Sequence, residues 1–248
     1  MNDLPQMKHK LVFIAIIFGV FAFSCESKLS AEAIIEKSLE EAHGGKSQWE
    51  TYKILSYEKT TTFYDSLGKV ENVKKQTFQN TLQPKFTSVI IWTEGDDEKR
   101  LVYNGEDTFV VVNGYQVAAT DTKKIATAHK EIMGAHYVFW QPYKLATDDV
   151  SLSLEGKVQL DDGSEVYKIK AVYPNSETIW WYYFDTETFL LKENLVKHGT
   201  TYSQIKNIQH EAKTGLFLNK ERKSYIIDST KNQKYLRAHY HYNILELK

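Results

Sequence analysis

The most constraining feature of this sequence is a period-two alternation of apolar and polar residues that begins at Tyr52 and continues almost to the end of the chain. Turn residues interrupt it roughly every 8 to 12 residues, and β-branched and aromatic residues are frequent between the turns. Asn-Gly, the strongest short hairpin signal, occurs at Asn104-Gly105 and at Asn113-Gly114. The pattern therefore predicts a mainly β, antiparallel chain with two meanders, which contain about eleven strands in all.

Two stretches of helical periodicity flank the first meander. In the first stretch, apolar residues recur at helical spacing between Ser30, a good N-cap residue, and Gly44-Gly45, a pair typical of a helix end. The second stretch runs from about Thr122 to Trp140, with Asp121 as its expected N-cap and Gln141-Pro142 as its stop. The sequence thus predicts two helices, and the apolar side of each needs a partner surface.

Two of the predicted strands are apolar on both faces, which a sheet with one solvent-exposed face does not require. In the segment 85–93, Phe86, Ser88, Ile90 and Trp92 alternate with Thr87, Val89, Ile91 and Thr93. In the segment 177–184, Ile179, Trp181 and Tyr183 alternate with Trp180, Tyr182 and Phe184. An ordinary two-sided core explains this pattern, and so does a sheet with one face on a helix and the other lining a cavity.

The N-terminal segment has the pattern of an export signal. An apolar run from Leu11 to Phe23 follows Lys8 and Lys10, and it is too short for a membrane span of about 20 residues. The run ends at Cys25, the only cysteine, in a setting that resembles the bacterial lipobox. We therefore expect a signal peptide at 1–24, a lipidated tether at 25–29 and a single domain at 30–248.

Lipidation of Cys25 implies a lasting membrane anchor. The diacylglycerol and N-acyl chains of such lipoproteins, palmitate among them, bury enough methylene groups to hold a protein on a bilayer. No acidic pair stands beside Glu26 and Ser27, so the tags that direct some lipoproteins to the cell surface are not evident. We expect an outer-membrane protein that faces the periplasm, and exposure at the cell surface stays open.

Composition excludes several classes of function. The 31 basic and 32 acidic residues are interspersed and give a net charge of −1, which is not the footprint of a nucleic-acid-binding protein. With Cys25 as the only cysteine, a thiol nucleophile and a disulfide are both excluded. We expect a monomer without a cofactor.

The residues capable of catalysis or metal binding do not form a recognised motif. His129, Glu131 and His136 lack the spacing of a zinc protease, in which the histidines stand four residues apart. His239 and His241 share a strand face, but no third ligand can be identified from sequence, so metal binding there stays open and no metal site is assigned. The acidic pairs, such as Asp161-Asp162, have turn chemistry. We therefore expect no enzymatic activity.

One stretch carries a family resemblance. The segment from Trp180 to Val196, "WWYYFDTETFLLKENLV", and the order of helices and meanders resemble periplasmic carriers and envelope lipoproteins of the LolA/LolB type. The segment from His43 to Trp49 is similar to uncharacterised lipoproteins of this build. The resemblance implies a strongly curved antiparallel half-barrel, with helices covering its concave side and a cavity for acyl chains. The chain departs from the soluble carrier in its lipid anchor and in having no evident arginine at the cavity mouth.

These observations predict a membrane-anchored envelope lipoprotein that binds a lipid or another hydrophobic ligand without chemistry. The residues expected to line the cavity are Trp92, Phe109, Val111, Trp181 and Tyr183 on strands, with Ile132, Met133 and Phe139 from the second helix as a lid. One alternative is an envelope scaffold or interaction lipoprotein whose core is filled by its own side chains. A further alternative is a metal-dependent hydrolase.

Overall fold

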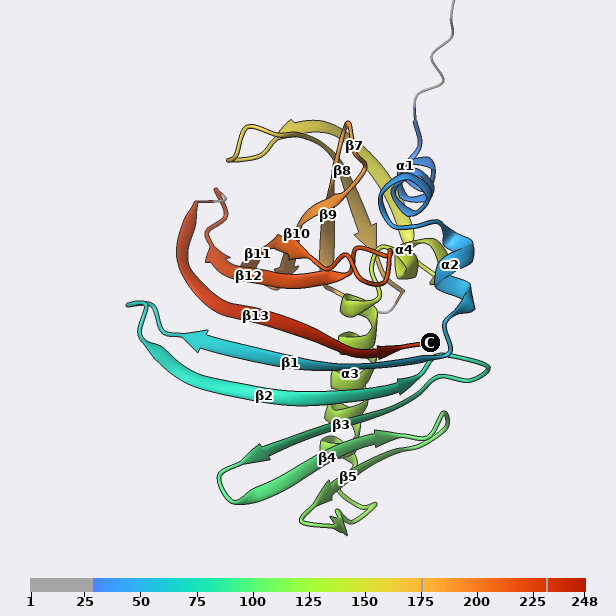
Figure 1. Cartoon of the computed structure of the whole chain (residues 1–248). Helices are drawn as coiled ribbons and strands as arrows, with labels where there is room; N and C mark the ends of the chain where they lie inside the picture. The colour runs from blue at the N-terminus through green and yellow to red at the C-terminus, as the bar shows by residue number, and fades with distance from the viewer. Residues whose placement is uncertain (1–28, 175, 231) are drawn as a thin grey trace, which may run out of the picture.

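The computed structural model describes residues 29–174, 176–230 and 232–248, so Cys25, the expected signal peptide and most of the expected tether lie outside the described residues. Within these residues the strands form one curved, unclosed antiparallel sheet of thirteen strands (Figure 1). The strands are β1 (Ile54–Tyr64), β2 (Val70–Thr81), β3 (Thr87–Glu94), β4 (Asp97–Tyr103), β5 (Thr108–Val112), β6 (Tyr115–Gln116), β7 (Ser151–Gln159), β8 (Glu165–Val172), β9 (Ile179–Asp185), β10 (Leu191–His198), β11 (Thr201–His210), β12 (Asn219–Ile227) and β13 (Gln233–Leu247).

The two predicted meanders meet in the middle of the sheet. The strand order is β6-β5-β4-β3-β2-β1-β13-β12-β11-β10-β9-β8-β7, so every neighbouring pair is consecutive in sequence except β1 and β13. That pair joins the start of the first meander to the end of the second, with Thr61 opposite Tyr240. The count of thirteen strands exceeds the expected number of about eleven, and the shortest strand, β6, has two residues.

The two Asn-Gly dipeptides both lie in hairpin connections, but only one forms the tight turn. Asn113 and Gly114 have φ values of 51° and 81°, the positive values that a two-residue turn between twisted strands requires. Asn104 instead begins the longer loop to β5, in which its Oδ1 accepts hydrogen bonds from the backbone N–H groups of Glu106 and Asp107.

The helices are more numerous than predicted. The first predicted helix consists of α1 (Ala31–Lys37) and a π-helical turn, η1 (Ser38–Ala42), and the Ser30 hydroxyl caps it by accepting from the Ala33 N–H at 3.1 Å. A separate short helix, α2 (Lys46–Thr51), follows the two glycines. The second predicted helix is α3 (Thr122–Phe139), which the Asp121 carboxylate caps, and a short α4 (Tyr143–Thr147) comes after it.

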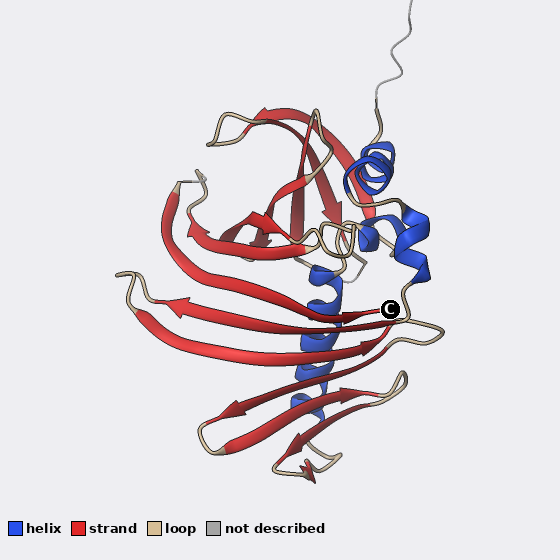
Figure 2. Cartoon of the chain, viewed as in Figure 1, coloured by secondary structure: helices blue, strands red, loops and turns tan. Residues whose placement is uncertain are grey.

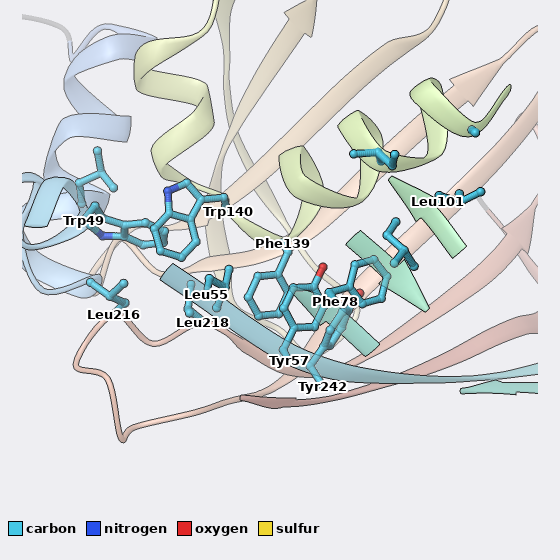
Figure 3. Packing of buried hydrophobic residues seen from close by; sticks show 14 of the residues in the cluster. Trp49, Leu55, Tyr57, Phe78, Leu101, Phe139, Trp140, Leu216, Leu218 and Tyr242 are labelled. Atoms are coloured by element: carbon cyan, nitrogen blue, oxygen red, sulfur yellow. The ribbon is translucent and has the colours of Figure 1, made fainter. Parts of the chain in front are cut away.

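Helix α3 runs across the strands on one face of the sheet, and the shorter helices lie together near one of its ends (Figure 2). Its apolar side packs on a row of inward-facing residues that are register partners across the first meander: Tyr57, Phe78, Ile90, Leu101 and Val110. In Figure 3, Phe139 of α3 lies against the aromatic residues of the sheet, and Trp140 lies beside Trp49 of α2. This is the main core of the molecule.

A second core lies between α1, α4 and strands β8–β10, and it contains Ile34, Ile35, Leu145, Tyr182 and Phe184. A third, smaller cluster lies on the opposite face of β8–β10 and includes one residue of β12; it contains Val166, Tyr183, Leu195 and Ile227. Strand β9 therefore has buried residues on both faces, as its sequence predicts.

Candidate ligand-binding site

Two grooves lie along α3 where it crosses the concave face of the sheet. The edge groove, of about 380 Å³, is lined by Trp92, Lys99, Leu101, Val110, Val112, Asp121, Lys123, Lys124, Thr127, Ala128 and Glu131. The central groove, of about 320 Å³, is lined by Tyr57, Lys59, Gln76, Phe78, Lys130, Glu131, Gly134, Ala135, Val138, Trp180, Ile205, Arg222, Tyr240 and Tyr242. The grooves adjoin at Glu131, and both combine apolar walls with charged groups, as small-molecule sites do.

A wider depression of about 710 Å³ lies at strands β1–β3. Its lining comes mainly from outward-facing positions such as Glu58, Val73 and Lys75, and it is more polar than the grooves along α3. Because polar atoms make up more of its lining than apolar atoms do, it is a weaker candidate for a hydrophobic ligand than either groove.

The three residues expected on the helix lie against the sheet. Ile132 and Phe139 are buried, and the Phe139 ring stacks on Tyr57 with centroids 4.0 Å apart. Met133 is partly buried against the same core. Ile132 and Phe139 thus hold α3 in place, and the uncharged surface that α3 presents to the central groove comes from Gly134, Ala135 and Val138.

Of the residues expected on the first meander, Trp92 lies on the concave face. It lines the edge groove, and the Lys74 ammonium lies 4.2 Å from the centroid of one of its rings. Phe109 and Val111 do not lie there, and this expectation was wrong. Their neighbour Val110 pairs with Leu101, which faces α3, so the period of two turns Phe109 and Val111 to the outer face. Val112 takes the expected place in the groove.

The expectation for β9 is corrected in the same way. Trp180 lines the central groove, whereas Trp181 and Tyr183 point to the opposite face. There the Trp181 Nε1–H donates to the Glu155 carboxylate at 3.1 Å. Tyr183 lines a separate cavity of about 140 Å³ together with Glu193, whose pKa is raised by burial. The structure therefore does not bring the expected lining residues together in one site.

Two cations of the central groove were not anticipated from the sequence. Arg222 of β12 is 2% exposed, and Lys59 of β1 is half-buried. The alternation within 216–227 places Arg222 on one face, but only the pairing of β12 with β13, Arg222 opposite Tyr240, places that face toward α3. The chain thus does have an arginine in its cavity, in the wall and not at the mouth.

The histidines considered as metal ligands fall into two groups. His129 is exposed and bonds to the Thr108 hydroxyl at 2.8 Å, whereas His136 is half-buried and stacks on Phe86. His239 and His241 lie on the outer face of β13, where Glu221 of β12 joins them. In the part of the chain that the structure describes, these three residues are the only cluster with metal-ligand geometry.

Sequence comparison finds no matching family model and no matching curated protein. The structure, however, is similar to solved ones. A LolA superfamily protein from Nitrosomonas europaea aligns with a TM-score of 0.52 and 10% identity, covering 88% of this chain and 93% of that chain. A DUF1329 family protein from Desulfovibrio piger aligns with a TM-score of 0.53 and 10% identity, covering 88% and 92%.

No helix within residues 29–174, 176–230 and 232–248 combines the length and hydropathy needed to cross a bilayer. The alignments cover nearly the whole length of both similar structures. The identities are low, so the likeness concerns the backbone arrangement. The chain has a LolA-like fold.

Proposed function

We propose that this protein is an envelope lipoprotein that binds a hydrophobic or amphiphilic ligand without catalysis. The observation that supports this most directly is the central groove, which lies at the middle of the open sheet and has aromatic and aliphatic walls. The name of one similar structure, a LolA superfamily protein, is consistent with a carrier role.

The energetics of the groove suit an acyl chain. Burial of apolar surface contributes about 25 cal/mol per Å², or about 0.8 kcal/mol for each methylene group removed from water. Several methylene groups therefore outweigh the free energy that association costs, provided that the walls are already formed. Tyr57, Phe78 and Phe139 stack on one another through Tyr57 and give the groove a fixed floor.

The anchor belongs to the same proposal. Lipidation of Cys25 would hold the protein on the periplasmic side of the outer membrane, and residues 26–29 would tether the sheet close to the bilayer. A protein held in this way binds or passes on lipids at the membrane surface. Nothing in the grooves requires a metal or an organic cofactor for that role.

Native mass spectrometry of the Cys25→Ser chain tests the binding function. A lipid that co-purifies with the protein, and that is lost when the groove is narrowed by Ala135→Trp, supports carriage. Ala135 is half-buried and lines the groove, so its replacement fills the space between α3 and the sheet. An apo mass together with failure to take up any added amphiphile would argue against the proposal.

The alternative of a scaffold protein is favoured by one observation. The stack of Tyr57, Phe78 and Phe139 already fills part of the space between α3 and the sheet. If the Cys25→Ser chain binds no lipid but co-purifies with another envelope protein, the scaffold function replaces the carrier function.

A further inference from the structure

The charge of the central groove identifies the class of amphiphile that it would bind. Arg222 reaches across the sheet, where its Nε–H donates to the Asn207 side-chain oxygen at 2.8 Å and its Nη2–H donates to that of Asn194 at 2.9 Å. Both partners are neutral amides. Arg222 is 2% exposed, and among the described residues no carboxylate lies within 4.0 Å of its guanidinium.

Lys59 lies in the same groove and also lacks a counter-ion. Its ammonium is 5.1 Å from the centroid of the Tyr240 ring and 5.9 Å from that of the Tyr242 ring. No carboxylate of the described chain lies within 4.0 Å of it. Burial lowers the pKa of Lys59 and the charge of Arg222 lowers it further, whereas Tyr240 and Glu131 act in the opposite direction. The two cations therefore share one low-dielectric space.

The other charged groups of the groove do not cancel this excess. Lys130 adds a positive charge at the rim, and Glu131 is the carboxylate of the lining. Glu131 is already engaged, since Lys74 and the Gln76 amide both donate to it at 3.3 Å. Withdrawing a cation from water is unfavourable unless an anion compensates its charge, and ring faces supply only a fraction of that compensation.

We propose that the central groove binds a single-chain amphiphile with an anionic head group, a carboxylate or a phosphate. The head group lies between Lys59 and Arg222, and the chain lies along Phe78, Ala135, Val138 and Trp180. A groove of about 320 Å³ is near the lower end of the range for small-molecule sites, which favours one chain over several. This inference rests on the proposed function and specifies its ligand class.

Calorimetric titration of the Cys25→Ser chain with three probes tests the inference: dodecanoate, dodecyl phosphate and dodecanol, each below the concentration at which it aggregates. A charge-assisted contact contributes about 1.5–3 kcal/mol, so we expect the preferred anion to bind at least tenfold more tightly than dodecanol. The first two probes distinguish a carboxylate head from a phosphate head.

Variants distinguish an effect of the charges inside the groove from an effect of the overall charge of the protein. Lys59→Met should reduce the ratio of the affinity for the anion to the affinity for dodecanol about tenfold. Lys75→Met is the matched control, because Lys75 lies on the neighbouring strand β2 but is exposed on the outer face. Arg222→Lys should keep part of the preference; its folding is checked by circular dichroism because Arg222 also holds Asn194 and Asn207.

The outcomes distinguish the two proposals. Equal affinity for all three probes, with no effect of Lys59→Met, would overturn the anionic ligand and leave the carrier function standing. An equal loss of the preference for the anion in Lys59→Met and Lys75→Met would also overturn the anionic ligand, because the preference would then come from overall charge. Binding of no probe at all would reject the inference and the proposed function together.

A second inference rests on the outer face of β12 and β13. Glu221 stands opposite His241 in the strand register, and His239 lies two residues before His241 on the same face. The His239 Nε2 is 2.8 Å from a Glu221 carboxylate oxygen, and one ligand atom from each of the three residues lies within 4.8 Å of the others. Sequence supplies the two histidines; the strand pairing supplies the third ligand.

We infer that Glu221, His239 and His241 form a site for a divalent transition-metal ion such as Zn²⁺. Two imidazoles and one carboxylate are a common zinc ligand set, and the exposed side of the site leaves room for water as a further ligand. The groups that face the site from neighbouring strands are Lys223, Thr60 and Thr62. Lys223 weakens the attraction for a cation, which is consistent with moderate affinity.

Titration of the untagged full chain with ZnCl₂, and absorption spectroscopy with Co²⁺, test the site. We expect one equivalent to bind, and His241→Ala to weaken binding at least tenfold. His241 is exposed, so this variant should fold, and His198→Ala is the control because His198 is exposed elsewhere on β10. No saturable binding, or equal binding by His241→Ala, would overturn the site.

Discussion

Three histidines of this protein are held in their neutral form by burial. His43 is 2% exposed; its Nδ1–H donates to the Leu216 carbonyl at 2.8 Å, and its Nε2 has no partner in the described chain. Burial lowers the pKa of His43 to about 4, and burial likewise lowers the pKa of His210 to about 4 and that of His136 to about 3. Each of these imidazoles is therefore neutral in the folded protein and charged in the acid-unfolded chain.

This difference predicts a loss of stability in acid. The folded-state pKa values lie below the unfolded value of 6.5, so the unfolded chain binds more protons between about pH 6.5 and pH 4. Stability is then complete above pH 6.5 and falls as the pH falls, by up to about 1.4 kcal/mol per pH unit for each histidine. Urea unfolding measured from pH 7 to pH 4.5 should show this slope. His136→Phe, which keeps the stack on Phe86, should make it shallower; an unchanged slope would contradict the assignment for His136.

Gly44 gives a second prediction at the scale of one residue. Its φ is +76°, and a Cβ there would lie 2.5 Å from the carbonyl oxygen of Gly215. Gly199 also has a positive φ, +56°, but a Cβ there would meet nothing within 4 Å. Gly199→Ala should therefore cost about 1 kcal/mol of backbone strain, and Gly44→Ala should cost at least about 1 kcal/mol more. Denaturant midpoints measure both, and equal losses would mean that the loop at Gly215 moves aside.

At the scale of elements, α3 decides which face of the sheet is the inside. Its apolar residues Ala128, Ile132 and Phe139 are buried against β1–β5, and residues beside them, such as Ala135, line the central groove. Capping at Asp121 and the stop at Trp140 were predictable because they depend on local sequence. The inward parity of β5 and β9 was not, because it depends on pairings between strands that are remote from those caps.

Substitutions in α3 test this arrangement. Ile132 is 1% exposed, so Ile132→Ala should lower the free energy of unfolding by about 2–5 kcal/mol. Gly134 is exposed, and a Cβ there would meet nothing within 4 Å, so Gly134→Ala should raise it by up to about 1 kcal/mol through helix propensity. Chemical denaturation of the two variants gives the comparison. A destabilising Gly134→Ala would mean that α3 is not a regular helix at that point.

At the scale of the whole molecule, one long-range pairing makes the groove. β1 and β13 are neighbours although they stand at opposite ends of the β-rich region, and their pairing places Lys59 beside Tyr242. The central groove therefore exists only when both meanders have folded and joined. Lipid binding and global folding should be lost together on denaturation.

The anchor is a property of the whole protein in its membrane. If Cys25 carries acyl chains, Cys25→Ser should move the protein from the membrane fraction to the soluble fraction, because the variant lacks the chains that would hold it on the bilayer. Fractionation followed by immunoblotting measures the change. Retention of Cys25→Ser on membranes that survives high-salt washing would contradict an anchor at this residue.

The sequence by itself determined the features that depend on near neighbours: the alternation that makes strands, the turn at Asn113-Gly114, and the caps at Ser30 and Asp121. Tertiary structure decided which face of each strand lies on the concave side. As a result, Val110 and Trp180 line the grooves, and not the expected Phe109 and Trp181. It also placed Arg222 and Lys59 in the same groove, and Glu221 in contact with His239. The physical reason is that a period of two defines two faces without distinguishing them, and only strand register and the position of α3 distinguish them.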